Sequence, residues 1–171
     1  MPTYAPPEAR CEVFTYKEGL LSAVGHDVKL AVERFEVTVE ADRVEATFDA
    51  GSIAVVCARK DGRDNPGALS DKDKRTIEGY VRDDVLHSRR YPKITFASEV
   101  FEEEGEDERR VEGELSLHGR TREIEATVRR DGDRWVCRVR LHQPDFGITP
   151  FKAMLGALRI QAHVDVELSV P

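Results

Sequence analysis

Alternation of apolar and polar residues is the feature that most constrains this chain, and it is clearest near the C-terminus. Charged and polar residues occupy every second position from Arg159 to Glu167. The positions between them are apolar, namely Leu158, Ile160, Ala162, Val164, Val166 and Leu168. A period of two brings alternate side chains to opposite faces of a β-strand. The segment is therefore predicted to be one strand with a buried face and a solvated face.

The same pattern recurs along most of the chain. It predicts strands over residues 20–32, 35–39, 44–48, 111–117, 124–128 and 135–141, and a further strand from Ile94. Residues 53–57 form a short continuous apolar run instead. The phase shifts near Glu33 and Arg34, which indicates a bulge or bend. Tight turns are expected at residues 41–43, 118–120 and 131–133. The charged run 102–110 is expected to be a solvated hairpin tip.

One substantial helix is predicted after a loop over residues 59–69, which is rich in Asp, Gly, Asn and Pro. Ser70 and Asp73 have the spacing of a capping box, and Gly79 weakens the helix and can divide it. The helix is expected to end before Tyr91 and Pro92. Its stripe of Ile77, Tyr80, Val81 and Val85 indicates core packing or a lid. A second, short helix is expected to begin at Pro150.

Composition sets the class of protein. Hydrophobic residues make up 40% and charged residues 35% of the 171 residues, as in folded globular domains. The net charge of −7 disfavours nucleic-acid partners, and no apolar run could span a bilayer. Residues 1–171 are predicted to form a single domain. No signal segment is recognisable, so the sequence as written predicts a cytoplasmic protein, or a periplasmic one if a leader had been removed.

Three segments in order resemble one known family. Residues 91–98 read YPKITFAS, residues 111–121 read VEGELSLHGRT, and residues 145–148 read DFGI. These segments resemble motifs of the YceI-like, polyisoprenoid-binding proteins of bacteria. The likeness is close over residues 91–171 and looser over residues 20–57. The family's aromatic pair after residues 82–88 is replaced here by Arg89 and Arg90.

The resemblance implies an all-β fold with a minor helix, an eight-stranded antiparallel lipocalin-like barrel with a helical insertion. It also implies a long hydrophobic pocket for a polyisoprenoid or fatty-acyl chain, and a homodimer. Inward phases and the family likeness together give the candidate ligand-binding residues. These are His26, Val28, Leu30, Phe35, Phe48, Ile53, Val85, Ile94, Phe96, Gly113, Leu115, Leu117, Phe146, Ile148, Phe151, Met154, Leu158 and Ala162.

Two features of this set allow alternatives. His26 is the one histidine on a long apolar phase. It is either a polar partner for a ligand head group or amide, or a core histidine bonded to a backbone carbonyl or to a neighbouring strand residue. Small inward residues such as Gly113, Ala126 and Ala162 either leave space for a ligand or interdigitate with large aromatic side chains.

Three functions remain open at this stage. The first is a carrier or sequestering protein for a hydrophobic small molecule. The second is a barrel with a filled core that acts as an interaction or dimer module. The third is an enzyme acting on an isoprenoid-like substrate, which would need at least two titratable groups in the pocket. The sequence lacks the common nucleotide, hydrolase and zinc-protease motifs. Its three cysteines are widely spaced and form no CxxC pair, which disfavours a disulfide framework and a zinc or redox motif, and its histidines are scattered. We therefore expect no catalytic residues, metal or cofactor.

Overall fold

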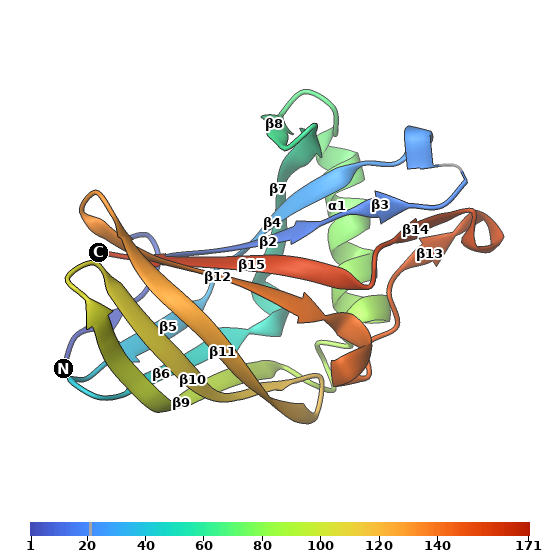
Figure 1. Ribbon diagram of the computed structural model, residues 1–171. Helices are drawn as coiled ribbons and strands as arrows, with labels where there is room; N and C mark the ends of the chain where they lie inside the picture. Colours follow the sequence, from blue (N-terminus) through green and yellow to red (C-terminus); the bar gives the residue numbers. More distant parts are fainter. Residues whose placement is uncertain (21) are drawn as a thin grey trace.

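A computed structural model describes residues 1–20 and 22–171, and for Val24 and Met154 it describes the backbone alone. Most of the described chain is β-structure arranged as one strongly curled sheet (Figure 1). The strands of this sheet are β1 (Thr3–Tyr4), β2 (Arg10–Thr15), β4 (Asp27–Val32), β5 (Phe35–Val39), β6 (Val44–Asp49), β7 (Ile53–Lys60), β8 (Arg63–Asn65), β9 (Lys93–Gly105), β10 (Glu108–Leu117), β11 (Arg120–Asp131), β12 (Arg134–His142) and β15 (His163–Val170).

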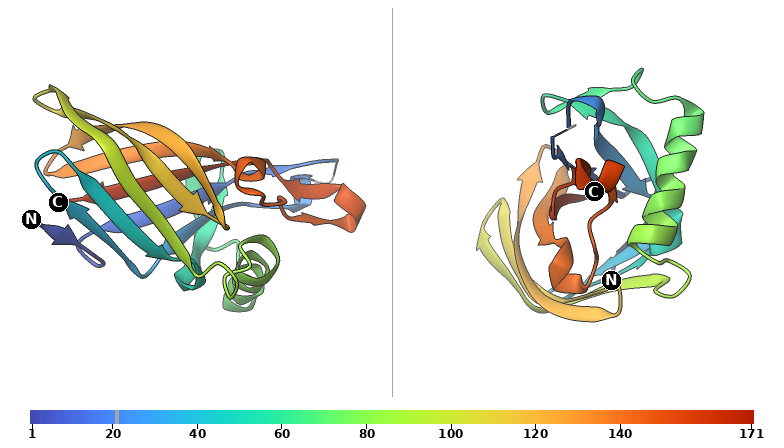
Figure 2. Two further views of the ribbon diagram at one scale, coloured as in Figure 1. Left: turned by 90° about the horizontal axis from the view of Figure 1, so that it is seen from below. Right: turned by 90° about the vertical axis from the view of Figure 1, so that its right-hand side faces the viewer.

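The strand order is β1-β5-β6-β9-β10-β11-β12-β15-β2-β4-β7-β8, and every neighbouring pair is antiparallel. The two ends of this order are joined by the chain itself, because β4 continues into β5 and β6 continues into β7. The sheet therefore curls around a single interior, as the view along its axis shows (Figure 2). This confirms the predicted fold class.

Two sharp bends make the curl possible. The chain turns at residues 33–34 and again at the 3₁₀ turn η2 (Ala50–Ser52). Ser52 Oγ accepts a hydrogen bond of 3.0 Å from the Arg34 N–H, and the Asp49 carboxylate accepts one of 2.9 Å from the Gly51 N–H. Arg34 also pairs with Asp49 at 2.8 Å. The bend predicted at Glu33 and Arg34 is confirmed.

The strand count differs from the predicted eight, since the main sheet has twelve strands among the described residues. The bends divide two long strands into four, and β1 and β8 are short additions. The alternation also missed β2 altogether. The run at 102–110 belongs mostly to β9 and β10, so the charged hairpin tip is shorter than predicted.

A smaller sheet projects from one end of the barrel. Its order is β13-β14-β3, formed by β13 (Lys152–Ala153), β14 (Leu158–Ile160) and β3 (Lys17–Glu18). The short helix predicted at Pro150 is wrong, because this segment forms a hairpin with the 3₁₀ turn η5 (Met154–Gly156) at its tip. The predicted strand 158–168 is likewise broken into β14 and β15.

The helix α1 (Asp71–Tyr80) packs beside β7 and continues as the π-helical turn η3 (Val81–Val85). Ser70 caps it as predicted: Ser70 Oγ accepts from the Asp73 N–H at 3.1 Å, and the Asp73 carboxylate accepts from the Ser70 N–H at 3.2 Å. Glu78 fastens the helix to the sheet by accepting a 3.0 Å hydrogen bond from the Val55 N–H. None of the helices among the described residues is long and apolar enough to cross a membrane.

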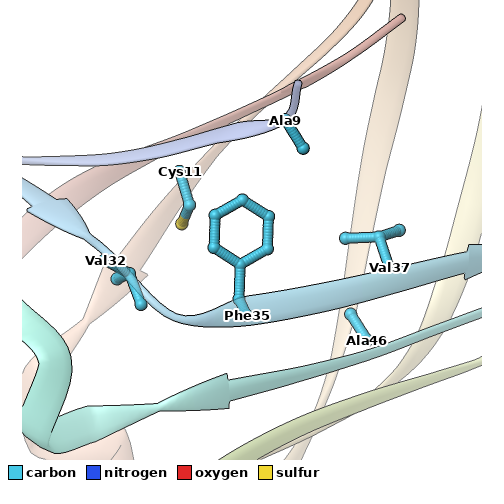
Figure 3. Close-up of a cluster of buried hydrophobic side chains, with 6 residues drawn as sticks. All are labelled: Ala9, Cys11, Val32, Phe35, Val37 and Ala46. Carbon is cyan, nitrogen blue, oxygen red and sulfur yellow. The ribbon is translucent and has the colours of Figure 1, made fainter. Parts of the chain in front are cut away.

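The interior is filled at one end of the barrel. Side chains from β2, β4, β5 and β6 point toward one another there (Figure 3). The ring of Phe35 is 5% exposed and stacks on Phe48 with ring centroids 5.5 Å apart. The buried members of this closed-end cluster are Ala9, Cys11, Val32, Phe35, Val37 and Ala46.

Candidate binding cavity

A cavity of about 520 Å³ occupies the rest of the barrel interior. Volumes of this order are typical of sites for small organic ligands. Its walls come from strands on both sides of the barrel, from α1 and η3 on one flank, and from the 3₁₀ turn η4 (Gln143–Phe146). The cavity therefore lies between the closed-end cluster and the end of the barrel where the helix and the small sheet are found. Figures 1 and 2 show the helix and the small sheet at that end of the barrel.

The cavity wall is almost entirely apolar because the inward phase of each strand is apolar. Val28 and Leu30 come from β4, and they are 6% and 1% exposed. Leu115 on β10 and Phe146 in η4 belong to a second buried cluster with Ile148. No carboxylate side chain is found among the described residues that line the cavity. Such a wall can hold a hydrocarbon by removing it from water.

The helix stripe forms part of this wall. Ile77, Tyr80, Val81 and Val85 all line the cavity, and the tilted rings of Tyr80 and Phe151 lie 4.9 Å apart. Tyr80 is 44% exposed, so it stands at the opening. The stripe combines the two predicted roles: Ile77 and Val81 pack against the core, and Tyr80 lies at the edge of the cavity.

Most of the candidate residues named from the sequence are brought together on this wall. Their contact with a ligand stays a prediction. The candidates that line the cavity are His26, Val28, Leu30, Phe48, Ile53, Val85, Ile94, Phe96, Leu115, Leu117, Phe146, Ile148, Phe151 and Leu158.

Three of the candidate residues do not line the cavity, and the side chain of a fourth is not among those that the structure describes. Phe35 fills the closed end instead. Gly113 sits where β9 and β10 approach closely at a bulge, since a Cβ atom on it would lie 2.2 Å from the Ala97 carbonyl oxygen. Ala162 lies at the break between β14 and β15, where its carbonyl accepts from the Gln143 N–H at 2.8 Å. The Met154 side chain lies outside the described part of the structure.

His26 is placed at the rim of the cavity and not in its interior. Both alternatives for this residue assumed a strand from residue 20 onward. Instead, Gly19 turns the chain with a φ of +101°, the 3₁₀ turn η1 (Ser22–Val24) follows, and β4 begins at Asp27. His26 is exposed and lines the opening, so the core-histidine alternative is wrong.

The wall contributed by β2 was not foreseen. Cys11, Val13 and Thr15 line the cavity, and Lys17 continues the same phase into β3. The alternation of apolar and polar residues is hard to recognise in β2 because its outward positions also carry large aromatic residues, Phe14 and Tyr16. Phe14 is only 5% exposed on the outside of the barrel, between the guanidinium groups of Arg59 at 4.8 Å and Arg138 at 5.0 Å. These cation–π contacts cover the Phe14 ring on the outer face of the barrel. From alternation alone, such a ring would be expected to point into the core.

The side chains whose pKa values are most strongly shifted are not shifted in the direction that would activate a catalytic group. Burial in the apolar wall raises the pKa of the Cys11 thiol to about 12 and that of Cys137 to about 11, which suppresses the reactive thiolate. The pKa of Asp165 is held well below its usual range, chiefly by hydrogen bonds from Arg140. Asp165 lies on the outward phase of β15 and stabilises the barrel wall there. The described residues contain no group of three or more metal-ligating side chains.

Two histidines join the helical segment to the barrel at the open end. His87 Nδ1 lies 3.0 Å from His118 Nε2, and His118 Nδ1 lies 3.2 Å from the Phe146 carbonyl oxygen. The Tyr91 ring packs on His118 with centroids 4.5 Å apart. Burial lowers the pKa of His118, and the nearby His87 and Arg120 lower it further. We call this arrangement the histidine clasp.

Comparison with known proteins agrees with this geometry. The sequence model of the YceI-like domain matches residues 8–171. No curated protein matched the sequence. Among solved structures, BcnA of Burkholderia cenocepacia superposes with a TM-score of 0.63 at 13% identity, over 95% of this chain and 96% of that one.

Two further structures have the same fold. A polyisoprenoid binding domain from Saccharophagus degradans, implicated in plant cell wall breakdown, has a TM-score of 0.59 at 16% identity, with 94% of this chain and 91% of that one covered. A YceI protein of Campylobacter jejuni has a TM-score of 0.59 at 15% identity, with 84% and 82% covered. At these identities the structural likeness shows the fold alone.

Proposed function

The chain belongs to the YceI-like domain family, and on this premise we propose that it binds one long hydrophobic molecule in the barrel cavity as a carrier or sequestering protein. The ligand class is a polyisoprenoid, an isoprenoid quinone or a fatty-acyl derivative. The observation that carries the proposal is the cavity of about 520 Å³ with its almost wholly apolar wall. The Saccharophagus degradans neighbour, described as polyisoprenoid binding, supports the ligand class.

The energetics of such a complex are favourable without a special polar contact. Burying one methylene group contributes about 0.8 kcal/mol, so a chain of ~20 carbons gains roughly 16 kcal/mol. Lost motion and side-chain ordering cost on the order of 4–15 kcal/mol. Micromolar or tighter binding is therefore expected. Because the wall is almost entirely apolar, it discriminates tails mainly by length and shape.

The two other functions have less support. A filled barrel acting as an interaction or dimer module predicts no internal cavity, and a large cavity is present. An enzyme requires activated groups facing the substrate, yet the buried thiols facing the cavity have raised pKa values. We therefore infer a binding protein and not an enzyme.

The proposal is tested by native mass spectrometry of the protein purified from its source, followed by organic extraction. We expect a discrete added mass that extracts as one lipid class. We also expect bound lipid to raise the unfolding temperature, because a ligand that binds the folded state stabilises it. An unliganded mass that takes up neither added isoprenoids nor fatty acids would overturn the proposal.

A further inference from the structure

Among the described residues, the charged side chains that line the cavity are all cationic. The whole chain carries 33 acidic and 26 basic residues. Among the described residues that line the cavity, however, the only side chains with a fixed charge at neutral pH are Lys17 and Arg159. Both are cationic, and His26 stands at the same opening. An anionic protein thus presents an apolar cavity with a cationic entrance.

Lys17 is directed inward by the strand phase. Cys11, Val13 and Thr15 are spaced two residues apart and all line the cavity, and Lys17 follows at the same spacing. The Lys17 ammonium donates one hydrogen bond of 3.2 Å to the Gly25 carbonyl oxygen. An ammonium has three donors, so two remain for another group.

The Lys17 ammonium also lacks an acidic partner within the described chain, since no carboxylate oxygen lies within 4.0 Å of it. The neighbouring acids are engaged elsewhere. Glu18 pairs with Arg159 at 2.8 Å, and the Asp27 carboxylate accepts from the Lys17 backbone N–H at 2.9 Å. Arg159 is thus neutralised by Glu18, which leaves the Lys17 charge for a ligand.

We propose that Lys17 binds the anionic head group, a carboxylate or a phosphate, of a single-chain lipid whose tail fills the cavity. This inference rests on the proposed function and specifies its ligand. The tail lies among the apolar side chains toward the closed end, and the head group stays at the opening beside β3. At the border of an apolar wall, a charge-assisted hydrogen bond from the ammonium to an anion is stronger than a hydrogen bond from it to a neutral group.

The experiment compares lipids that share a tail and differ in the head group. Oleic acid is measured against oleyl alcohol, and geranylgeranyl phosphate against geranylgeraniol. Each displaces a neutral fluorescent probe from the full-length protein at low and high salt. We expect the wild-type protein to bind the acid or the phosphate about tenfold tighter than the matched alcohol at low salt, and less so at high salt. The acid and phosphate arms distinguish the two sources of negative charge.

Variants of Lys17 then test whether this side chain causes the preference for an anionic head group. Lys17→Gln is expected to abolish the preference for the anionic head group, and Lys17→Arg to restore most of it. Lys152→Gln is the matched control, because Lys152 is an exposed cation on β13 beside β14 that does not line the cavity. The control is expected to keep the wild-type ratio.

The outcomes separate this inference from the proposed function. Equal binding of acid and alcohol by the wild-type protein, with the probe displaced by both, would overturn the role of Lys17 and leave the carrier function standing. A preference that survives Lys17→Gln would also overturn it. Failure of all four lipids to bind would remove the proposed function, and the inference with it.

Discussion

The two ends of the barrel use the same alternation of residues and reach opposite results. At the closed end, Phe35 and Phe48 stack, and small residues such as Ala9, Cys11 and Ala46 fill the space around them. At the open end the described side chains that line the interior are mostly aliphatic, and a space of about 520 Å³ lies between them. The first end is packed and the second is hollow.

The difference shows that alternation determines which side chains face the barrel interior. It does not determine whether inward side chains from opposite strands come into contact. At the closed end, the bends at residues 33–34 and 50–52 bring β5 and β6 toward β2. At the open end, α1, η3 and η4 complete the wall from the side, so opposite strands need not approach each other (Figure 2). Stability is expected to concentrate at the closed end, and ligand exchange at the open end.

The strongest test compares one aromatic ring from each end. Phe35→Ala is expected to lower the free energy of unfolding by about 3–5 kcal/mol, because it leaves a void in a packed cluster. Phe151→Ala removes a ring that is partly exposed at the opening, and it is expected to cost about 1 kcal/mol. Urea unfolding of both variants measures the difference. Equal losses would mean that the two ends are packed alike.

The cysteines test how dry the interior is. A pKa of about 12 for Cys11 leaves about a thousandth of the ordinary thiolate at pH 8. We therefore expect Cys11 to react with a thiol reagent far more slowly in the folded protein than in urea, and more slowly than Cys137, whose pKa is about 11. Rates are read by peptide mapping after timed alkylation. Fast labelling of Cys11 in the native protein would show that water reaches the closed end.

Much of this organisation was predictable because strand faces follow directly from period two. The helix cap at Ser70, the bend at Glu33 and Arg34, and the turn at residues 131–133 were all predicted from local signals, and all are confirmed. Most inward candidates do line the cavity.

The errors have a common physical cause. Phe35 and Val28 have the same signature in the sequence, yet one fills the closed end and the other lines the cavity, because distances across the barrel depend on tertiary bends. Strand β2 was missed because Arg59 and Arg138 cover the outward Phe14, a long-range contact. His26 was misplaced because the 3₁₀ turn η1 (Ser22–Val24) interrupts the alternation that the sequence suggests is continuous from residue 20 to residue 32.

A smaller effect is expected from shortening the cavity. Ala126 on β11 is 9% exposed and lines the wall, so Ala126→Leu adds carbon atoms to the space where the tail lies. Excluding about two methylene groups weakens binding of the longest chains by roughly tenfold, and shorter chains are affected less. A series of fatty acids of increasing length measures this. The control is Glu125→Leu, at the exposed neighbouring position on the same strand, which leaves the length dependence unchanged.

The smallest effect concerns the histidine clasp at the open end. Because the pKa of folded His118 lies below its ordinary value, the unfolded chain takes up a proton first as pH falls below about 6.5. The unfolded state then binds more protons than the folded state, so stability is lost as the pH decreases through that window and is regained above it. His118→Asn tolerates the local φ of +54° and removes this titration.

We therefore expect the urea midpoint of the wild-type protein to fall more between pH 7.5 and pH 5.5 than that of His118→Asn. His26→Asn, which changes an exposed histidine at the rim, serves as the control and should keep the wild-type pH dependence. Phe35→Ala is expected to be destabilised at the closed end. If its urea midpoint nevertheless falls with pH as much as that of the wild-type protein, the acid-induced loss of stability is assigned to the open end. Identical pH dependence in the wild-type protein and His118→Asn would instead mean that the clasp does not couple protonation to folding. The acid-sensitive step would then lie elsewhere in the barrel.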